Sequence, residues 1–167
     1  MSPPPGQTDD LNNAALAFGN SPDGQRLAAI YQYWDGKRRG RLMPSRADID
    51  PIELKPYLPQ LVLLDVEGEP PRFRYRLVGT EVTRVRQGLR SSDPTGQFVD
   101  EVTHHQGTGA VLAHYRRVVA ERKPSTDAGT YTPSPERPWI RFSRLVLPLS
   151  ADDVAVNMLL VALVPTR

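Results

Sequence analysis

Two neighbouring segments carry the clearest hydrophobic pattern in the chain. Residues 61–66 are almost wholly apolar, which is typical of a central strand covered on both faces. Residues 72–78 alternate between charged and apolar side chains with a period of two, which indicates a strand with one buried face. Because glycine and proline separate the two segments, the pattern predicts a β-hairpin. The side chains predicted to point inward from its second strand are Phe73, Tyr75 and Leu77.

Two longer segments show the spacing of amphipathic helices. Ser21 is a suitable N-cap with Pro22 at the first helical position, and apolar residues follow at intervals of three and four. This pattern predicts a helix over residues 21–38 that packs either on the sheet or on a second copy of itself. Its apolar stripe consists of Leu27, Ile30, Tyr31 and Trp34. A second helix is predicted over residues 108–121. Its residues expected to face the sheet are Val111, Tyr115 and Val118.

Shorter elements complete the pattern. Asp50 followed by Pro51 predicts a helix of one or two turns, and residues 81–86 predict another short helix. The D-P-T-G run at residues 93–96 predicts a tight turn after a polar loop. Three further strands are predicted at residues 127–132, 139–147 and 154–164. This order of elements predicts an α+β domain in which helices gather on one face of a five-stranded antiparallel sheet.

The chain divides into three parts. Residues 1–20 are rich in Pro, Gly, Asn and Asp, and we expect them to form a disordered tail. Residues 21–60 form an N-terminal helical extension, and residues 61–167 contain the strands of the main domain. With 167 residues, of which 39% are hydrophobic and 24% charged, the composition fits one core rather than two.

The composition removes several classes of chemistry. The absence of cysteine excludes disulfides, thiolate nucleophiles, cysteine-ligated metals and cysteinyl cofactor adducts, and it agrees with a cytoplasmic location. The longest apolar run, residues 154–164, is shorter than the roughly 20 residues that span a bilayer, so we expect no membrane insertion. The net charge of +2 permits anionic partners without requiring them. Because no nucleophile, metal or phosphate-loop motif is visible, we expect no enzymatic activity.

Four segments, in this order, carry a resemblance to a known family. They are P-S-R-A-D-I-D-P at residues 44–51, the apolar strand at 61–66, F-R-Y-R-L-V-G-T at 73–80 and D-P-T-G at 93–96. Together they resemble a bacterial PAS-like family of small, mostly single-domain proteins. The resemblance implies a sheet of strand order 2-1-5-4-3, a pocket between the sheet and the helices, and a sensory or interaction function. The chain departs from the family pattern in two places. An aliphatic residue is usual at the position of Pro94, and the segment of residues 85–92 is a few residues longer than the corresponding segment of the family.

This topology places the second strand opposite the helix of residues 108–121. The expected ligand-binding residues are Phe73, Tyr75, Leu77, Val111, Tyr115, Val118 and Asn157. Two tyrosine hydroxyls and one amide among apolar side chains suit a small, mainly apolar ligand, although the same residue types also build a filled core. We predict no cofactor and no metal site. His114 is the residue at which a haem could bind, but it lies near the edge of the apolar stripe, which favours a surface or boundary histidine over an iron ligand.

A basic cluster at the end of the first helix has two interpretations. Cations are favoured beside the free carbonyl groups of a helix end, which is a structural role. The planar guanidinium groups also suit phosphate, which indicates an anion site. The residues of that alternative site are Arg38, Arg39, Arg41 and Arg46. Ser45 and Asp48 fit a capping pattern, which favours the structural role for this region.

We therefore expect a non-enzymatic, cytoplasmic PAS-type module that senses a small metabolite or docks on a signalling protein. The alternative is an anion-binding adaptor for a cyclic nucleotide or nucleic acid, whose binding should weaken steeply as salt rises. Because the residues include no kinase or cyclase segment, we expect the signal to pass by association. The predicted association is a homodimer through the helix of residues 21–38, without a nucleic-acid partner.

Overall fold

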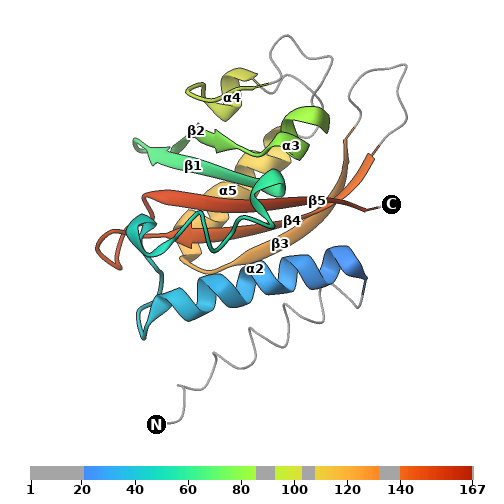
Figure 1. Ribbon diagram of the computed structural model, residues 1–167. Coiled ribbons are helices and arrows are strands. Elements are labelled where there is room, and N and C mark those ends of the chain that lie inside the picture. Colours follow the sequence, from blue (N-terminus) through green and yellow to red (C-terminus); the bar gives the residue numbers. More distant parts are fainter. Residues whose placement is uncertain (1–20, 86–92, 103–107, 132–139, 167) are drawn as a thin grey trace.

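The computed structural model describes residues 21–85, 93–102, 108–131 and 140–166, which Figure 1 traces in colour. The predicted disordered tail and most of the predicted polar loop before Asp93 lie outside the described residues.

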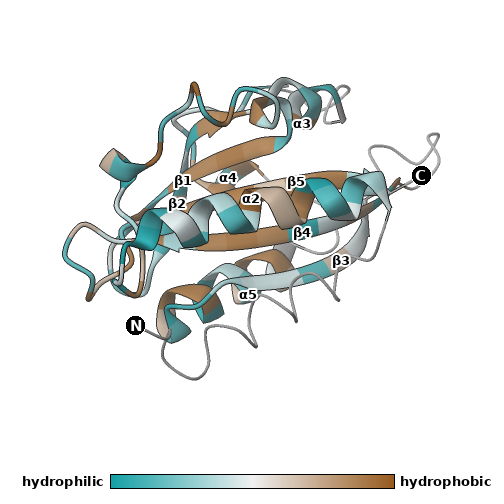
Figure 2. Ribbon diagram, turned by 60° about the horizontal axis from the view of Figure 1, so that its bottom comes forward, coloured by the Kyte–Doolittle hydropathy of each residue, from teal (hydrophilic) through white to brown (hydrophobic). Residues whose placement is uncertain are grey.

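Five strands form one antiparallel sheet. They are β1 (Leu61–Glu67), β2 (Arg72–Val78), β3 (Ser125–Tyr131), β4 (Ile140–Leu149) and β5 (Met158–Thr166). Their order across the sheet is β2-β1-β5-β4-β3, so the predicted α+β, PAS-like architecture is confirmed. The three central strands β1, β5 and β4 are the most hydrophobic ribbons in Figure 2, whereas the edge strand β3 is paler.

The described residues include four α-helices and two short 3-10 helices. They are α2 (Pro22–Arg38), α3 (Thr80–Val85), α4 (Val99–Val102) and α5 (Thr108–Glu121), with η1 (Arg46–Asp48) and η2 (Leu58–Gln60). The bounds predicted for the two long helices agree with α2 and α5. The short helix predicted at residues 81–86 corresponds to α3.

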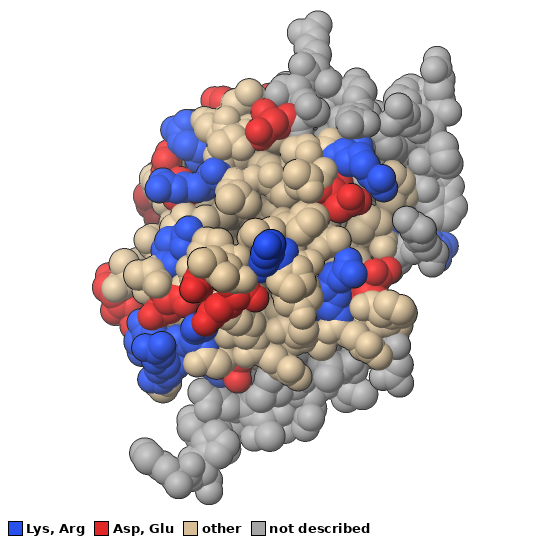
Figure 3. Space-filling model, in the orientation of Figure 1, with Lys and Arg blue, Asp and Glu red and all other residues tan. Residues whose placement is uncertain are grey.

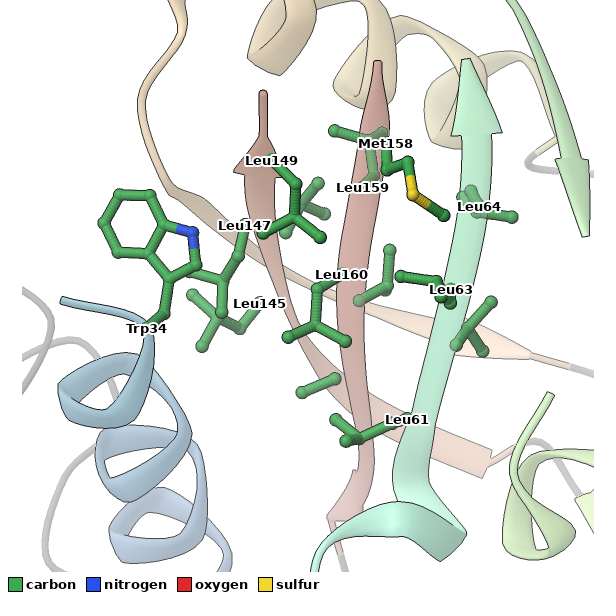
Figure 4. Packing of buried hydrophobic residues seen from close by; sticks show 14 of the residues in the cluster. Trp34, Leu61, Leu63, Leu64, Leu145, Leu147, Leu149, Met158, Leu159 and Leu160 are labelled. Carbon is green, nitrogen blue, oxygen red and sulfur yellow. The ribbon is translucent and has the colours of Figure 1, made fainter. Parts of the chain in front are cut away.

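The two long helices lie on opposite faces of the sheet (Figures 1 and 2). The guanidinium of Arg144 on β4 lies 5.7 Å from the ring centre of Tyr115 on α5, so Arg144 points to the α5 side. Neighbouring residues of a strand point to opposite faces. Leu145 and Leu147 therefore point to the other side, where Figure 4 shows them beside Trp34 of α2. Each face of the sheet thus has its own helical cover.

Helix α2 forms as the sequence predicts and buries its apolar stripe within the same chain. The Ser21 side chain accepts a hydrogen bond from the backbone N–H of Gly24 at 3.0 Å, which caps the first turn. Leu27, Ile30, Tyr31 and Trp34 are all buried. The indole N–H of Trp34 donates to the carbonyl of Pro148 on β4 at 2.9 Å. The hydrogen bond and the buried stripe together fasten α2 to the sheet.

Gly79 permits the close approach of β2 and η2. A Cβ atom at this position would lie 2.3 Å from the backbone oxygen of Pro59 and 2.4 Å from that of Leu58, which no larger residue tolerates without a shift of the backbone. The N–H of Gly79 donates to the carbonyl of Leu61 at 2.8 Å. The glycine in F-R-Y-R-L-V-G-T therefore has a packing reason.

Two predicted elements differ from those observed. After Asp50 the chain makes hydrogen-bonded turns that lead into η2, rather than an α-helix, because Pro56 and Pro59 supply no N–H donor for a continuous helix. The last strand begins at Met158, not at residue 154. The Asp152 carboxylate accepts hydrogen bonds from the backbone N–H groups of Val154 and Ala155, both at 2.9 Å, and so holds residues before β5 in a turn.

Candidate ligand-binding site

The α5 face of the sheet brings together most of the residues predicted to bind a ligand. The ring of Tyr115 packs edge-on against the ring of Phe73, with 5.3 Å between ring centres. Tyr75 and Val118 are also buried, and Val111 is partly buried against the same core. These five side chains come from β2 and α5, as the predicted topology requires.

The prediction that Leu77 points inward is wrong, because β2 contains a β-bulge. Leu63 of β1 pairs with Leu77, but the next residue, Leu64, pairs with Tyr75, so the register passes over Arg76. One extra residue reverses the side-chain alternation beyond it. Leu77 is consequently on the other face and 44% exposed.

Asn157 lies away from the predicted pocket. It precedes β5 and its side chain is exposed. Its backbone serves the sheet instead, because its N–H donates to Leu149 at 3.0 Å and its carbonyl accepts from Val66 at 3.0 Å. The polar partner predicted from the last strand is therefore absent from this group of residues.

The polar groups observed on the α5 face are a charged pair rather than the amide of Asn157. Asp127 on β3 and Arg144 on β4 are direct partners in the antiparallel register. The guanidinium of Arg144 donates two hydrogen bonds to the Asp127 carboxylate, Nε to Oδ1 at 2.9 Å and Nη2 to Oδ2 at 2.5 Å. Arg144 is 5% exposed, and its guanidinium also lies 5.3 Å from the ring centre of Phe142. The pair is thus fixed by bidentate geometry and by aromatic packing.

His114 completes the charged cluster, and the expectation that it lies at the surface or at a boundary is wrong. The residue is 6% exposed, and its Nδ1 lies 3.2 Å from Asp127 Oδ2. This separation is within hydrogen-bonding range, although the two groups are not aligned for a well-formed hydrogen bond. Among the described residues, Nε2 of His114 has no hydrogen-bond partner. We call the buried residues Arg144, His114 and Tyr115, together with Asp127, whose side chain is 31% exposed, the buried polar cluster.

The cluster maintains its charges despite burial. Burial opposes ionisation of Asp127, but His114 and Arg144 outweigh that effect and lower the pKa of the carboxyl group well below its usual range. Burial also lowers the pKa of Arg144, but the bonded Asp127 carboxylate more than offsets it, so the pKa is raised. Burial raises the pKa of the Tyr115 hydroxyl, which therefore stays protonated. In a neutral imidazole, an ionised carboxylate beside Nδ1 favours the tautomer with hydrogen on Nδ1, and Nε2 is then an acceptor.

The buried polar cluster was missed by sequence reasoning, apart from Tyr115 and the mention of His114. Arg144 stands directly before the apolar residues that continue β4, so a charged side chain entering a buried run was a visible signal. Asp127 opens a predicted strand that pairs with the strand containing Arg144. The register between the two strands was needed to bring them together.

The basic cluster at the end of α2 is mostly engaged by protein groups. Arg41 donates to the carbonyls of Arg38 at 2.9 Å and Lys37 at 3.1 Å, and pairs with Asp48 at 2.6 Å. Arg38 pairs with Asp35, and Arg46 donates to the carbonyl of Ile49 at 3.0 Å. These contacts satisfy helix carbonyls and acids of the same segment, which is the structural role. The alternative anion site at Arg38, Arg39, Arg41 and Arg46 stays a prediction.

The predicted Ser45–Asp48 capping pattern is confirmed. The backbone N–H and the hydroxyl of Ser45 donate to the Asp48 carboxylate at 2.8 Å and 2.9 Å, and the capping box is complete. The hydrogen bonds from Ser45 and Arg41 lower the pKa of Asp48 to about 2. This segment is therefore locked by its own side chains.

Comparison with known proteins identifies the family. A family model described as a PAS domain matches residues 23–164, and the chain therefore belongs to the PAS domain family, whose members are sensory and signalling modules. A search of curated proteins finds no match. In the part of the chain that the structure describes, no helix is long and apolar enough to cross a membrane, and no three potential metal-binding side chains group together.

Proposed function

We propose that this chain is a non-enzymatic, cytoplasmic sensory module that binds a small molecule between α5 and the sheet and passes the signal by association with a protein partner. One observation carries the ligand proposal: the buried polar cluster interrupts an otherwise apolar layer beside Phe73 and Tyr75. A buried polar group that lacks a partner destabilises a fold by about 1 to 3 kcal/mol, and Nε2 of His114 has no partner among the residues that the structure describes. A ligand that donates a hydrogen bond to Nε2 relieves this penalty.

The ligand implied by these residues is small and mainly apolar, with a hydroxyl or N–H group. Phe73, Tyr75 and Val118 supply apolar contact surface on two sides. The carboxylate of Asp127 already neutralises Arg144, so the cluster offers no unbalanced positive charge to an anion. An acceptor nitrogen at His114 selects a donor group instead.

Native mass spectrometry of freshly purified protein tests the ligand proposal. We expect the wild type to retain a small molecule and His114→Phe to lose it, since phenylalanine keeps the aromatic volume but removes the acceptor. Ile52→Ser is the control, because Ile52 is 80% exposed and far along the chain from α5. Retention of the same mass by His114→Phe would show that Nε2 does not select the ligand.

Tyr115→Ala distinguishes an open pocket from a filled core. Loss of a tightly packed ring lowers the free energy of unfolding by roughly 3 to 5 kcal/mol, and loss of a ring that borders a ligand-accessible cavity lowers it much less. Urea unfolding of the two proteins measures the difference. A loss in the larger range, with no small molecule recovered from the wild type, would leave a protein-docking module without a ligand.

The homodimer through the helix of residues 21–38 is the second part of the association proposal. Its large apolar residues, Ile30 and Trp34, are 0% and 1% exposed within one chain, so a dimer has to use the outer side of α2 or exchange the helix between copies. Light scattering at high protein concentration measures the oligomeric state. Glutamate at Ile30 and Trp34 is expected to unfold the chain rather than to yield a folded monomer, because each charge would enter the core.

A further inference from the structure

Both long helices end at the same end of the molecule, beside the loop between β4 and β5. Leu42, which follows α2, donates its backbone N–H to Asp153 Oδ2 in that loop at 3.2 Å. Arg122, which follows α5, donates from Nη1 to the carbonyl of Val154 at 3.4 Å. These contacts join three segments that are far apart in the sequence. We call the exposed residues Arg39, Leu42, Arg122 and Val154 the helix-end patch.

The apolar part of the helix-end patch is exposed in a rigid setting. Leu42 is 54% and Val154 63% exposed, which makes them two of the four large exposed hydrophobic residues in the described part of the chain. The Asp153 carboxylate also accepts from the N–H of Met43 at 3.0 Å. The Ser150 hydroxyl donates to the carbonyl of Ala155 at 2.6 Å. A preformed surface loses little conformational entropy when a partner binds.

Positive backbone φ angles concentrate at this patch. Among the described residues, the non-glycine residues with positive φ are Arg39 at 51°, Arg122 at 57° and Asp153 at 61°. Arg39 and Arg122 occupy the positions after the two helices, where glycine is the usual residue because it has no Cβ. Arg39 and Arg122 therefore each place a long cationic side chain at a position whose backbone conformation favours glycine.

The helix-end patch carries charges of both signs, with exposed cations beside acids. Arg39, Arg122 and the next residue, Lys123, are exposed and form no salt bridge with a described residue. The Asp152 and Asp153 carboxylates each accept hydrogen bonds from two backbone N–H groups and keep their negative charge, and the Glu53 carboxylate, which pairs with Lys37, also attracts Arg39. Figure 3 shows basic side chains gathered where α2 ends, with acidic side chains beside them. The surface combines apolar contact area with a basic rim.

We propose that the helix-end patch is the docking surface for an acidic segment of a protein partner. An apolar side chain of that segment packs on Leu42 and Val154 while its carboxylates meet Arg39 and Arg122. A nucleic acid fits less well, because its phosphates offer no apolar side chain to cover Leu42 and Val154. This proposal depends on one part of the proposed function, namely that the module signals by association with a protein partner.

Short peptides followed by NMR of the full chain test this proposal. The first probe carries two leucines flanked by glutamates, and the matched probes replace the glutamates by glutamines, the leucines by glycines, or the glutamates by lysines. We expect the first probe to shift the backbone signals of residues 39–43, 122–123 and 151–156 with a Kd of about 1 mM or tighter. Each replacement should weaken binding. Equal binding of the glutamine probe, or no binding by the first probe, would overturn the proposal.

Charge reversal supplies the matched variants. Arg39→Glu combined with Arg122→Glu should weaken binding of the acidic probe about fivefold or more, since two exposed ion pairs are lost. Leu42→Ser combined with Val154→Ser should weaken it without changing its salt dependence. Arg84→Glu and Ile52→Ser make the same kinds of change elsewhere on the surface and should leave binding unchanged. Equal weakening by the control variants would contradict a site at the helix-end patch.

Two further probes identify a different occupant. A short DNA duplex or an anionic lipid vesicle that shifts the same signals, when the acidic peptide does not, would overturn the protein-segment proposal in favour of a phosphate-binding surface. Retention of a small molecule in native mass spectrometry tests the ligand site on the α5 face, and the variants of the helix-end patch should not affect it. Failure of the docking proposal is therefore distinguishable from failure of the ligand proposal.

Discussion

The two faces of the sheet are covered by helices of similar length but differ in chemistry. The α2 face is filled by large apolar side chains, with Trp34, Ile30 and Leu27 each 0–1% exposed. Among the described residues, the buried histidine and arginine, His114 and Arg144, both lie on the α5 face. Apolar burial, the dominant favourable contribution to folding, stabilises both faces, because Phe73, Tyr115 and Val118 are buried on the α5 side as well. The buried charged and hydrogen-bonding side chains are concentrated on the α5 face.

This difference assigns the two helices different tasks. Burial of a charged pair is weak evidence for stability, because desolvation offsets much of the attraction between Asp127 and Arg144. A protein that needed only a filled core gains little from such a pair. The polar cluster on the α5 face therefore supports a binding function, and the α2 face supports the frame that holds it.

The largest expected effect lies on the α2 face. Trp34→Ala removes a fully buried ring and its hydrogen bond to Pro148, so we expect the free energy of unfolding to fall by about 3 to 5 kcal/mol. Urea unfolding followed by circular dichroism measures it. Trp34→Phe is the control, since it keeps most of the apolar surface and should lose much less. Similar losses for the two variants would mean that the hydrogen bond outweighs burial.

The second effect tests the charged pair on the α5 face. Arg144→Met leaves the ionised Asp127 without its main partner, and we expect a loss of about 3 kcal/mol, at the low end for a buried pair because the Asp127 side chain is 31% exposed. The double variant Asp127→Leu, Arg144→Met should recover most of that loss. Urea unfolding of the three proteins compares them. If the double variant is no more stable than the single one, the ion pair itself contributes to stability, and the loss in Arg144→Met is not due only to an unpaired Asp127 charge.

The third effect concerns the pH dependence of stability, to which Asp48 beside α2 and Asp127 on the α5 face contribute differently. Carboxyl groups with a lowered pKa in the folded state stabilise the fold above their ordinary pKa near 3.8, and this stability is lost as the pH falls through the folded pKa. For Asp48, which supports the segment after α2, the loss falls between about pH 4 and pH 2. For Asp127 it extends to lower pH. Asp48→Asn and Asp127→Asn should each flatten the fall in stability, by on the order of 1 kcal/mol for partly exposed groups.

Urea midpoints at a series of pH values check this prediction. The Asp48→Asn curve should approach that of the wild type at about pH 2, whereas the Asp127→Asn curve should still differ there. Curves that coincide with the wild type throughout would show that the two carboxyl groups titrate alike in the folded and unfolded chains.

Most of the frame could be predicted from the sequence because it depends on local patterns. The apolar run of β1, the alternation of β2 and the spacing of the α2 stripe each define an element by its own residues. Gly96 has φ of 88° in the predicted turn at residues 93–96, as its residue type allows. The order of such elements then indicated the sheet.

The polar cluster could not be predicted in the same way because it depends on register between strands. Asp127 meets Arg144 only through the pairing of β3 with β4, and His114 reaches them only because α5 crosses above. The position of His114 relative to its own helix stripe predicted a boundary residue. The burial of this residue comes from neighbours on other elements, which helical periodicity does not encode.

The smallest expected effect tests the β-bulge that carries Leu77 onto the α2 side. Leu77→Thr should change the free energy of unfolding by no more than about 0.5 kcal/mol, because the side chain is 44% exposed. The same change at its register partner, Leu63→Thr, should cost at least about 2 kcal/mol, because that side chain is 7% exposed and threonine would bury a hydroxyl. Urea unfolding compares the two. Had the simple alternation of β2 continued, Leu77 would lie in the core beside Tyr75, and both substitutions would destabilise the protein by similar amounts.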